Sequence, residues 1–353
     1  MNKAKFVLSK KKVLEQYNKI EKLCDMVSYS FKTNNEVGKI LEDKTGCVFN
    51  VAFKNSVDEI KDKKRIWFLV QGWNEKELKE LIDKNITSFI IDNENDLRIL
   101  EDFLRENNTK VNILLRLRLK EHTIFTEKYF VYGFYSDAIN KNILRIIEDK
   151  KIYEKIDNLG IHFHRKTQNI GEWSLKFELE NLIKEEVFKK IDIVSIGGGL
   201  PSYYRNSSVF DIEKIFEKIK ETRNFLDKYN IKLIIEPGRF IAAPSIKLIT
   251  YVRNVYENTI IINASVYNTN LDTILLPLKL LVENELDVHG NKGESYLIKG
   301  YTPCSLDIFR YSVRLKNKPK IGDKIVFINA GAYNYRTDFC DLNKLNTEIV
   351  EGF

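Results

Sequence analysis

The fold of this chain is limited most by short apolar runs that alternate with longer amphipathic runs over about its first two thirds. Eight runs have the length and the β-branched and aromatic content of buried strands. They lie at 27–31, 47–52, 66–70, 88–91, 111–117, 160–164, 191–196 and 232–236. Apolar residues three and four positions apart predict helices between them, at 37–43, 57–61, 75–84, 94–107, 136–157, 174–190 and 210–229. Strands and helices in this order predict an α/β protein with a (β/α)8 TIM barrel.

The pattern changes after Pro244, where β-rich segments follow one another directly. They lie at 246–255, 259–264, 296–298 and 324–328. A chain of 353 residues with 43% hydrophobic content has enough apolar side chains for one large and one smaller domain. We therefore predict a barrel over 25–244 and an all-β domain over 245–353, and we expect segment 1–24 to join the β domain.

Composition argues against several classes of protein. The 57 basic residues exceed the 50 acidic ones by a net charge of +7, but the excess is spread through mixed-sign runs. Because no basic block is interleaved with aromatic residues, we expect no nucleic-acid partner. The chain has no apolar run of the roughly 18 residues that a membrane helix needs, and its first twelve residues lack the apolar core of a signal peptide. We predict a soluble, cytoplasmic protein without a membrane partner.

The four cysteines, Cys24, Cys47, Cys304 and Cys340, show no CxxC spacing. Four cysteines in a chain of this length predict neither a disulfide framework nor a zinc site. We expect ordinary buried thiols, with the exception of Cys304, which lies in a motif discussed below.

Residues that could take part in catalysis or ligand binding lie where the predicted strands end. Lys32 ends the first strand, Arg116 the fifth and His164 the sixth, while 197–199 and 236–239 follow the seventh and eighth. Barrel enzymes keep their active sites at this end of the strands. A lysine there is either a solvated charge or an amine that forms a Schiff base with an aldehyde. Lys32 alone does not decide between the two.

These positions fit pyridoxal phosphate as a cofactor. Three glycines without side chains at 197–199 let backbone amides approach a phosphate, and Arg239 adds positive charge. Glu236 can accept a hydrogen bond from a protonated pyridine nitrogen, and His164 can stack on the ring. Taken singly, each has a simpler explanation, as a tight turn, a turn carboxylate or a strand histidine.

His162 and His164 also form an HxH pair on one side of a strand, so a metal-dependent hydrolase is an alternative. Such a site needs more ligands, and the other two histidines, His122 and His289, follow no predicted strand end. We therefore expect no metal. A dinucleotide fold is disfavoured because Gly-Gly-Gly-Leu-Pro at 197–201 breaks the GxGxxG spacing, and the chain has no GxxxxGK[ST] motif.

Together the motifs resemble those of the fold type III, pyridoxal-phosphate-dependent decarboxylases, which include ornithine, diaminopimelate and carboxynorspermidine decarboxylases. Residues 29–34 (YSFKTN) look like the family's Y-A-V-K-A-N, and 160–164 (GIHFH) look like its G-L-H-x-H. Residues 196–201 (IGGGLP) look like I-G-G-G-F/L-P, 236–239 are EPGR unaltered, and 330–333 (AGAY) contain GAY. The matches follow the family order over nearly the whole chain.

The resemblance implies an alanine racemase-like barrel and a pyridoxal phosphate cofactor. It implies that Lys32 carries the internal aldimine, that His164 stacks on the ring and that Glu236 pairs with the ring nitrogen. It further implies cofactor contacts for Arg116, Thr167, Gly198, Gly199, Gly238, Arg239 and Tyr333. The implied reaction is removal of the α-carboxylate of an amino acid, with a lysine or a thiol returning the proton.

Two motifs depart from the family pattern. Residues 300–307 (GYTPCSLD) resemble G-P-T-C-[D/E]-x-x-D, but an ungapped match places Pro303 on the catalytic cysteine and Cys304 on the acidic residue that recognises the substrate. Either Cys304 reaches the same place through a shifted backbone, or the proton donor has changed. The motif implies substrate contacts for Tyr301, Cys304 and Asp307. Asn50 stands where the family usually has aspartate, and we expect a larger or conjugated amino acid as substrate.

The family resemblance also implies a homodimer with shared active sites, in which the cysteine loop reaches the partner's site. Two alternatives remain. An amino-acid racemase would use the same barrel and lysine without releasing carbon dioxide. A non-catalytic, decarboxylase-like regulator that binds partners instead of substrate is favoured only by the altered cysteine loop.

Overall fold

The structure is a computed structural model and describes residues 2–118, 132–207, 211–287, 292–334 and 341–353. The chain forms two compact units. One, here called the barrel unit, consists of Tyr17–Leu200 and Asp211–Gly238. The other, the β unit, consists of Met1–Gln16, Pro201–Phe210 and Arg239–Phe353.

The barrel unit is built on eight parallel strands that form a closed barrel. They are β2 (Met26–Ser30), β3 (Val48–Val51), β4 (Ile66–Leu69), β5 (Ser88–Ile91), β6 (Val111–Arg116), β7 (Ile156–His162), β8 (Ile193–Ser195) and β9 (Lys232–Ile235). Each strand pairs with the next in the sequence, and β9 pairs with β2 to close the ring. This arrangement confirms the predicted TIM barrel.

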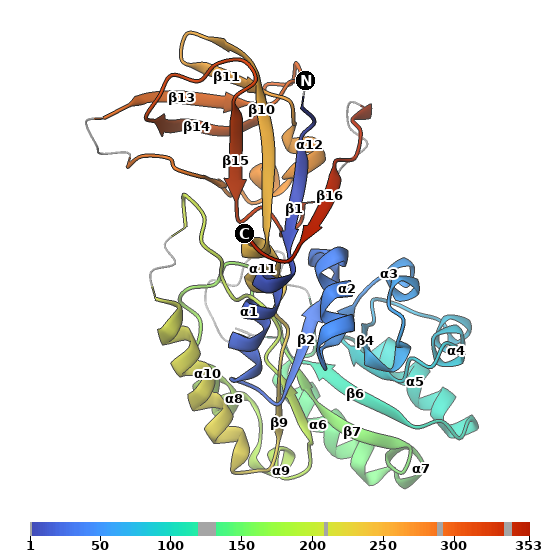
Figure 1. Cartoon of the computed structure of the whole chain (residues 1–353). Coiled ribbons are helices and arrows are strands. Elements are labelled where there is room, and N and C mark those ends of the chain that lie inside the picture. The colour runs from blue at the N-terminus through green and yellow to red at the C-terminus, as the bar shows by residue number, and fades with distance from the viewer. Residues whose placement is uncertain (1, 119–131, 208–210, 288–291, 335–340) are drawn as a thin grey trace. The chain divides into compact units, whose positions relative to one another are not determined.

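Helices cover the outside of the barrel (Figure 1). They are the end of α1 (Lys10–Glu21), α2 (Asn35–Lys44), α3 (Lys54–Glu59), α4 (Glu75–Asp83), α5 (Glu94–Glu106), α6 (Ser136–Glu148), α7 (Lys150–Tyr153), α8 (Leu175–Leu182), α9 (Glu185–Phe188) and α10 (Ile212–Asp227). Asparagine side chains cap several of them: Asn34, Asn74 and Asn93 each accept a backbone N–H of the first turn.

Two predicted helices are wrong in extent. The predicted helix at 136–157 ends at Glu148, because Asp149 leaves the helical backbone conformation (φ −80°, ψ 87°), and β7 already begins at Ile156. The spacing of apolar residues continued through this break, so periodicity alone did not reveal it. The predicted helix at 174–190 is divided into α8 and α9, with Ile183 extended between them.

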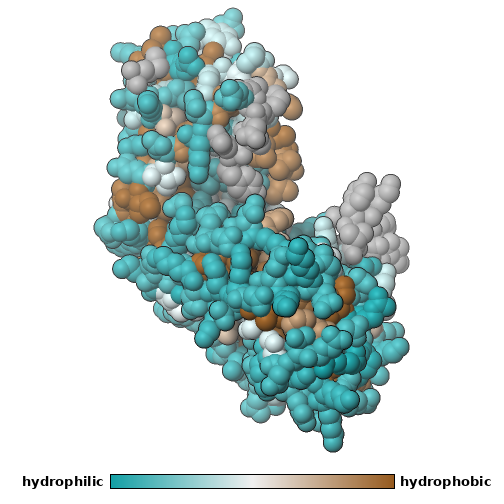
Figure 2. Space-filling view, turned by 90° about the vertical axis from the view of Figure 1, so that its right-hand side faces the viewer, coloured by the Kyte–Doolittle hydropathy of each residue, from teal (hydrophilic) through white to brown (hydrophobic). Residues whose placement is uncertain are grey.

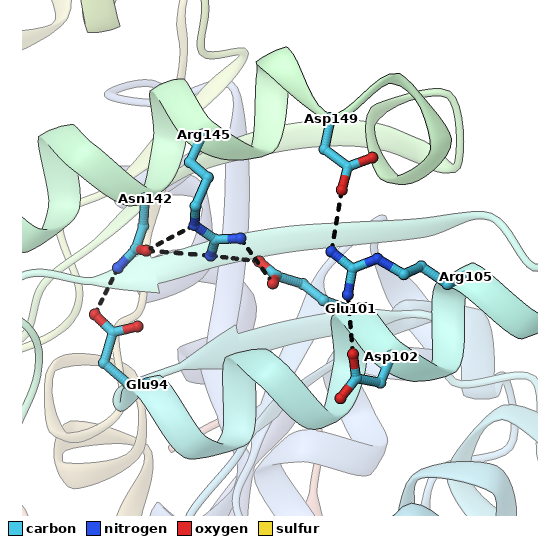
Figure 3. Close-up of polar contacts among 7 residues, drawn as sticks. All are labelled: Glu94, Glu101, Asp102, Arg105, Asn142, Arg145 and Asp149. Atoms are coloured by element: carbon cyan, nitrogen blue, oxygen red, sulfur yellow. Dashed lines mark hydrogen bonds and ion pairs between the residues drawn. The ribbon is translucent and has the colours of Figure 1, made fainter.

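Polar contacts join α5 to α6 on the outer surface of the barrel (Figure 3). Arg145 on α6 donates two hydrogen bonds to the carboxylate of Glu101 on α5, at 2.8 and 2.6 Å. One helical turn before Arg145 on α6, Asn142 donates to Glu94 at the start of α5. Glu101 is buried, so this bidentate ion pair neutralises a carboxylate that would otherwise be costly to bury.

The middle of the barrel interior is apolar. Inward-facing side chains from five strands pack together there: Trp67, Ile90, Leu114, Ile193 and Ile234. Gly160 on β7 faces the same space, and a Cβ atom on it would lie 2.9 Å from Leu114 and 2.0 Å from the carbonyl oxygen of Ile193. The glycine of the HxH motif is therefore needed for the barrel to close around its core.

A neutral polar chain lies below this core, near the amino-terminal ends of the strands. Asn158 donates to Oδ1 of Asn112 at 2.6 Å, and Asn112 donates to Oγ of Ser88 at 2.9 Å. We call these three residues the base network. Each member uses the next one as its partner, so the chain satisfies itself without a charged group.

The β unit contains an eight-stranded sheet. Its strands are β1 (Lys5–Ser9), β10 (Ile246–Tyr256), β11 (Thr259–Ile262), β12 (Leu281–Val282), β13 (Glu294–Lys299), β14 (Ile308–Leu315), β15 (Lys324–Ile328) and β16 (Asn346–Val350). The order is β12-β15-β10-β11-β13-β14, and β1 pairs with both β10 and β16. The four predicted β segments are confirmed. Short helices accompany the sheet: α11 (Arg239–Ala242), α12 (Val266–Thr269) and α13 (Asp272–Leu275).

The surface is predominantly hydrophilic on the face shown in Figure 2, where hydrophobic residues form separate patches. Among the described residues, no helix has both the length and the apolar content required to cross a membrane.

Candidate active site

Lys32 lies in a single 3-10 turn, η1 (Phe31–Thr33), directly after β2. Phe31 and Thr33 are buried on either side of it, whereas Lys32 is exposed, so the turn presents the amine at the rim of the barrel. The turn packs against the segment that follows β9: a Cβ atom on Gly238 would lie 2.2 Å from Oγ1 of Thr33. Gly238 thus lets the segment after β9 pack closely against the turn after β2.

Glu236 follows β9 and is 2% exposed, and three side chains donate hydrogen bonds to its carboxylate. Ser195 Oγ lies 2.8 Å from Oε1, while Asn50 Nδ2 and His162 Nε2 lie 3.0 and 3.2 Å from Oε2. We call these four residues the rim network. Burial alone would raise the pKa of Glu236, but its interactions with His162, and then those with His164, lower that pKa well below its usual range. Glu236 is therefore ionised.

The tautomer of His162 follows from its surroundings. Its Nδ1 is buried and has no hydrogen-bond partner among the described residues. A proton on that nitrogen would be buried and unpaired, so the neutral ring carries its proton on Nε2, where Glu236 accepts it. The rim network thus contains one negative charge and three donors.

His164 is held by the glycine segment that follows β8. Its Nδ1 accepts a hydrogen bond from the backbone N–H of Gly198 at 3.2 Å and lies 3.9 Å from Oε2 of Glu236. Burial lowers the pKa of His164, in spite of the opposing effect of Glu236. A neutral imidazole with its Nδ1 engaged in this way keeps its ring orientation fixed, which suits a ring that stacks on a planar ligand.

His162, His164 and Glu236 also have their possible ligand atoms within 4.8 Å of one another. A metal ion among them would have to displace the Gly198 N–H from His164 and the Glu236 contact from His162. Hydrogen bonding within the protein therefore explains the cluster without a metal. His122 and His289, the two other histidines of the sequence, lie outside the described residues.

The three glycines after β8 are required by space. Gly197 and Gly199 have positive φ angles of 64° and 96°. A Cβ atom on Gly197 would lie 2.1 Å from the carbonyl oxygen of Phe163, and one on Gly198 would lie 3.0 Å from Cε1 of His164. The segment therefore brings its backbone against β7 and His164. Thr167 belongs to the facing loop, in which the N–H of Asn169 donates to the carbonyl of Gly199.

Arg116 ends β6 and is in register with His162 on β7, so its side chain starts from the inner side of the barrel rim. Its guanidinium carbon lies 4.9 Å from the ring centroid of Tyr132. Burial lowers the pKa of Arg116, while Asp92 and Glu236 oppose that shift.

Two of the residues expected to bind phosphate lie together in the β unit. Nη1 of Arg239 is 2.7 Å from Oδ2 of Asp272 and 2.9 Å from the hydroxyl of Tyr204. The ring of Tyr333 lies 4.9 Å from the Arg239 guanidinium carbon. Arg239 is buried, so Asp272 and Tyr204 hold its guanidinium in one orientation.

The cysteine loop of the β unit is shaped by Asp307. Its carboxylate is fully buried and accepts hydrogen bonds from the N–H of Val266 (2.9 Å) and from the N–H and hydroxyl of Thr302 (3.1 and 2.7 Å). A Cβ atom on Gly300 would lie 2.2 Å from this carboxylate. The first and last residues of the motif are therefore locked together, and the loop is tied to the start of α12.

This lock brings Cys304 to Tyr267 on α12. The thiol sulfur lies 3.0 Å from the tyrosine hydroxyl, and this hydrogen bond, followed by one from the backbone of Leu306, lowers the pKa of Cys304. By contrast, burial raises the pKa of both Cys24 and Cys47 to about 12. Cys340 lies outside the described residues. Cys304 is thus the most acidic of the described thiols.

Two large side chains of the same loop are exposed. Tyr301 is 36% exposed, with the guanidinium of Arg253 5.1 Å from its ring centroid, and Leu306 is 56% exposed. Their side chains give the loop an apolar outer surface.

Several members of these networks were not predicted. Ser195, Tyr204, Tyr267 and Asp272 belong to no recognised motif, and Asn50 was noted only as a departure. Alternation along the strand that ends at 196 could have placed Ser195 on the inner face. No comparable signal marks Tyr267, which is 37 residues away from Cys304 in the sequence.

A closed (β/α)8 barrel with an exposed lysine, a buried ionised carboxylate and a glycine segment at one rim defines a class of cofactor-dependent enzymes. The donor set suits pyridoxal phosphate: the carboxylate can accept from a pyridine N–H, and the glycines let backbone approach a phosphate. Residues 10–243 match the family model described as "Pyridoxal-dependent decarboxylase, pyridoxal binding domain". The chain therefore belongs to the pyridoxal-dependent decarboxylase family, and its cofactor is pyridoxal phosphate.

Two curated relatives show the range of the family. The chain is 24% identical over 298 residues to the diaminopimelate decarboxylase of Bacillus subtilis, a match that covers 77% of this chain and 66% of that protein. It is 28% identical over 189 residues to the carboxynorspermidine/carboxyspermidine decarboxylase of Campylobacter jejuni, which covers 48% of this chain and 46% of that protein. The matched part thus spans between 46% and 66% of the length of these relatives.

Solved structures share the fold over nearly the whole chain. The lysine/ornithine decarboxylase of Vibrio vulnificus, solved with putrescine, gives a TM-score of 0.80 at 19% identity. The match covers 99% of this chain and 95% of that one. A diaminopimelate decarboxylase from Helicobacter pylori, solved with L-lysine, gives a TM-score of 0.81 at 18% identity.

Proposed function

We propose that this chain is a pyridoxal-phosphate-dependent decarboxylase that removes the α-carboxylate of an amino acid or of a conjugate that carries one. The observation that carries the proposal is the ionised, buried carboxylate of Glu236, held by three donors at the rim where Lys32 is presented. When bound, the cofactor withdraws electrons from the α-carbon of the substrate, so that carbon dioxide can leave.

The residues of the chain divide the work of holding the cofactor. Lys32 would provide the amine for its aldehyde, Glu236 would accept from the ring nitrogen, and His164 would lie against the ring. Gly198, Gly199, Thr167, Arg239 and Tyr333 remain our proposal for the phosphate, on the family motifs that carry them. Gly238 allows the close packing of the Lys32 turn, and Arg116 remains the candidate for the hydroxyl side.

Cys304 is the proposed proton donor for the α-carbon. Its contact with Tyr267 supports this role, because a thiol with a lowered pKa gives up its proton more readily near neutral pH. If Cys304 takes the place of the catalytic cysteine, Ser305 stands where the motif has an acidic residue, and a serine cannot pair with a distal amine as a carboxylate could. We therefore propose a larger or conjugated amino acid as the substrate, in contact with Tyr301 and Cys304. The carboxylate of Asp307 is buried against Thr302, so in our proposal it shapes the loop and does not contact the substrate.

The experiment that tests this function measures carbon dioxide released by the purified chain loaded with pyridoxal phosphate. The substrates are ornithine, lysine, diaminopimelate and carboxynorspermidine, and the control is Lys32→Ala. We expect carbon dioxide only from the unmodified enzyme and fastest from the larger substrates. Rapid turnover of ornithine or lysine would contradict the substrate proposal, and loss of chirality without carbon dioxide would identify a racemase. If treatment of the loaded enzyme with borohydride attaches no cofactor to Lys32, the proposed function itself is overturned.

We also propose a homodimer with shared sites. The exposed Tyr301 and Leu306 in the cysteine loop support this, since an apolar loop surface is typical of an interface. Mixing Lys32→Ala with Cys304→Ala subunits under conditions of subunit exchange should restore part of the activity, because some dimers then contain one intact site. If no activity returns while exchange is demonstrated, the sites are not shared.

A further inference from the structure

Asn50 stands apart from the other donors to Glu236, because it occupies the end of β3, on the opposite side of β2 from the segment that carries Glu236. Its side chain is buried, and its Nδ2 donates to Oε2 of Glu236 at 3.0 Å. The resembling motif has aspartate here, and this chain has an amide. The atoms at position 50 therefore determine how much charge the rim network contains.

A carboxylate accepts hydrogen bonds only, so the group that approaches Oε2 at this distance must be a donor. The amide nitrogen meets that requirement without taking up a proton. An aspartate in its place would put two carboxylates about 3 Å apart in a buried site, and one of them would have to bind a proton. With asparagine, the network contains one negative charge.

The other two donors do not compensate for this contact. Ser195 bonds to the second oxygen, Oε1, and His162 shares Oε2 with Asn50. Asn50 and His162 therefore approach one oxygen from two strands, β3 and β7, and together they fix the rotation of the carboxylate. The other titratable or charged groups near Glu236 are His164, 3.9 Å away, and Arg116.

We infer that Asn50 is a positioning residue. It keeps Glu236 ionised, as the one negative charge of the rim network, and oriented for a cationic N–H donor such as a protonated ring nitrogen. This inference deepens the proposed function and depends on it for the identity of that donor. The hydrogen-bond arrangement itself belongs to the protein without cofactor. It can therefore be tested separately from the reaction.

The test compares the unfolding free energy of the cofactor-free protein with that of Asn50→Asp across a pH series. In the variant, the two adjacent carboxylates share a proton in the native state, so the shared pKa lies above the unfolded value of about 4. When a carboxyl pKa is raised on folding, stability falls as pH rises from the unfolded pKa toward the folded pKa. We expect the variant to bind about one proton more than the wild type in its native state, and the two curves to diverge toward neutral pH.

The matched control is Asn112→Asp in the base network. Asn112 also lies inside the barrel, but its neighbours are Asn158 and Ser88, which can donate to both oxygens of an aspartate. We expect less divergence from the wild type than for Asn50→Asp. Equal slopes for the two aspartate variants would overturn the inference, since the effect would then follow from any aspartate inside the barrel.

A second variant covers the case in which Asn50→Asp does not fold at neutral pH. The exchange Asn50→Asp with Glu236→Gln again pairs one carboxylate with one amide, so it should regain the shallow pH slope. It should regain only part of the lost stability, because the new amide N–H at position 236 then faces the N–H of His162. The same protein should not regain decarboxylation, because the charge has moved away from position 236. A double variant as unstable as the single one would also overturn the inference, whereas failure of the wild type to release carbon dioxide would contradict only the proposed function.

Discussion

The barrel contains two polar networks at opposite ends of one apolar core, and they use similar side chains in different ways. In the base network, each side chain bonds to the next, and the total charge is zero. In the rim network, three side chains all donate to a single carboxylate. Convergence on one ionised group, and not polarity as such, separates a candidate active site from a structural contact here.

The difference has a physical cost that only function explains. Burying a carboxylate costs desolvation free energy that several hydrogen-bond donors must offset. A neutral chain of amides needs only one partner for each member. The rim network also occupies the end where Lys32 and the glycine segment lie. The two networks therefore provide internal controls for each other, with comparable substitutions in the same barrel.

The largest effect is expected for Glu236→Gln. The side chain keeps its shape and two hydrogen-bond positions but loses its charge, so it no longer stabilises a protonated ring nitrogen. We expect kcat for decarboxylation to fall on the order of 10²- to 10³-fold, the range that removal of one preorganised electrostatic contact causes in other enzymes. Steady-state release of carbon dioxide measures it. A loss of less than about tenfold would show that convergence on Glu236 does not mark the active site.

The complementary substitution is Asn112→Leu in the base network. It leaves the hydroxyl of Ser88 and the amide of Asn158 without Asn112 as their partner. An unsatisfied buried polar group costs about 1–3 kcal/mol, and these contacts are half-buried, so the lower end of that range applies. We expect that loss in the free energy of unfolding, measured with urea, and an unchanged kcat. A fall in kcat comparable to that of Glu236→Gln would erase the distinction between the two networks.

Much of the architecture could be predicted from local sequence. The strand at 88–91 coincides with β5, because a short run of buried apolar residues between polar turns has few alternatives. The strand β14 (Ile308–Leu315) was missed, since it mixes arginine, serine and tyrosine with its apolar residues, as suits a strand with exposed positions. Likewise, the helix predicted to continue past Asp149 failed because the apolar spacing continued where the backbone did not.

The partners within the site depend on register between strands, which one strand does not encode. Asn50 and Glu236 are 186 residues apart in the sequence and meet because β3, β2 and β9 are neighbours in the closed barrel. Lys32, His164 and Glu236 could be predicted because each belongs to a motif at a strand end. Their roles remain proposals, as do the domain limits at 24 and 244 and the assignment to the cytoplasm.

The dependence of the unfolding free energy on pH below about 5 should also distinguish the networks. The pKa of Glu236 is lowered in the native state, so its contribution is fully present above the unfolded value of about 4.3 and is lost as pH falls below that value. Glu236→Gln has no such contribution. We expect the wild type to lose more stability than Glu236→Gln between about pH 5 and pH 2, measured by urea unfolding of the cofactor-free proteins. Parallel curves would mean that Glu236 is not held as an ionised group.

The smallest effect concerns the cysteine loop, where the same logic applies to a thiol outside the barrel. Tyr267→Phe removes the hydroxyl that lies 3.0 Å from Cys304, so the pKa of that thiol should rise. We expect alkylation of Cys304 by iodoacetamide at neutral pH to slow by about 2- to 10-fold, which corresponds to the loss of one hydrogen bond to the thiolate. Tyr301→Phe is the matched control, because Tyr301 belongs to the same loop and faces Arg253. Cys304→Ser gives the background from the other cysteines. Equal slowing by both phenylalanine variants would show that the loop moves as a whole, and Tyr267 would then have no specific effect on the acidity of the thiol.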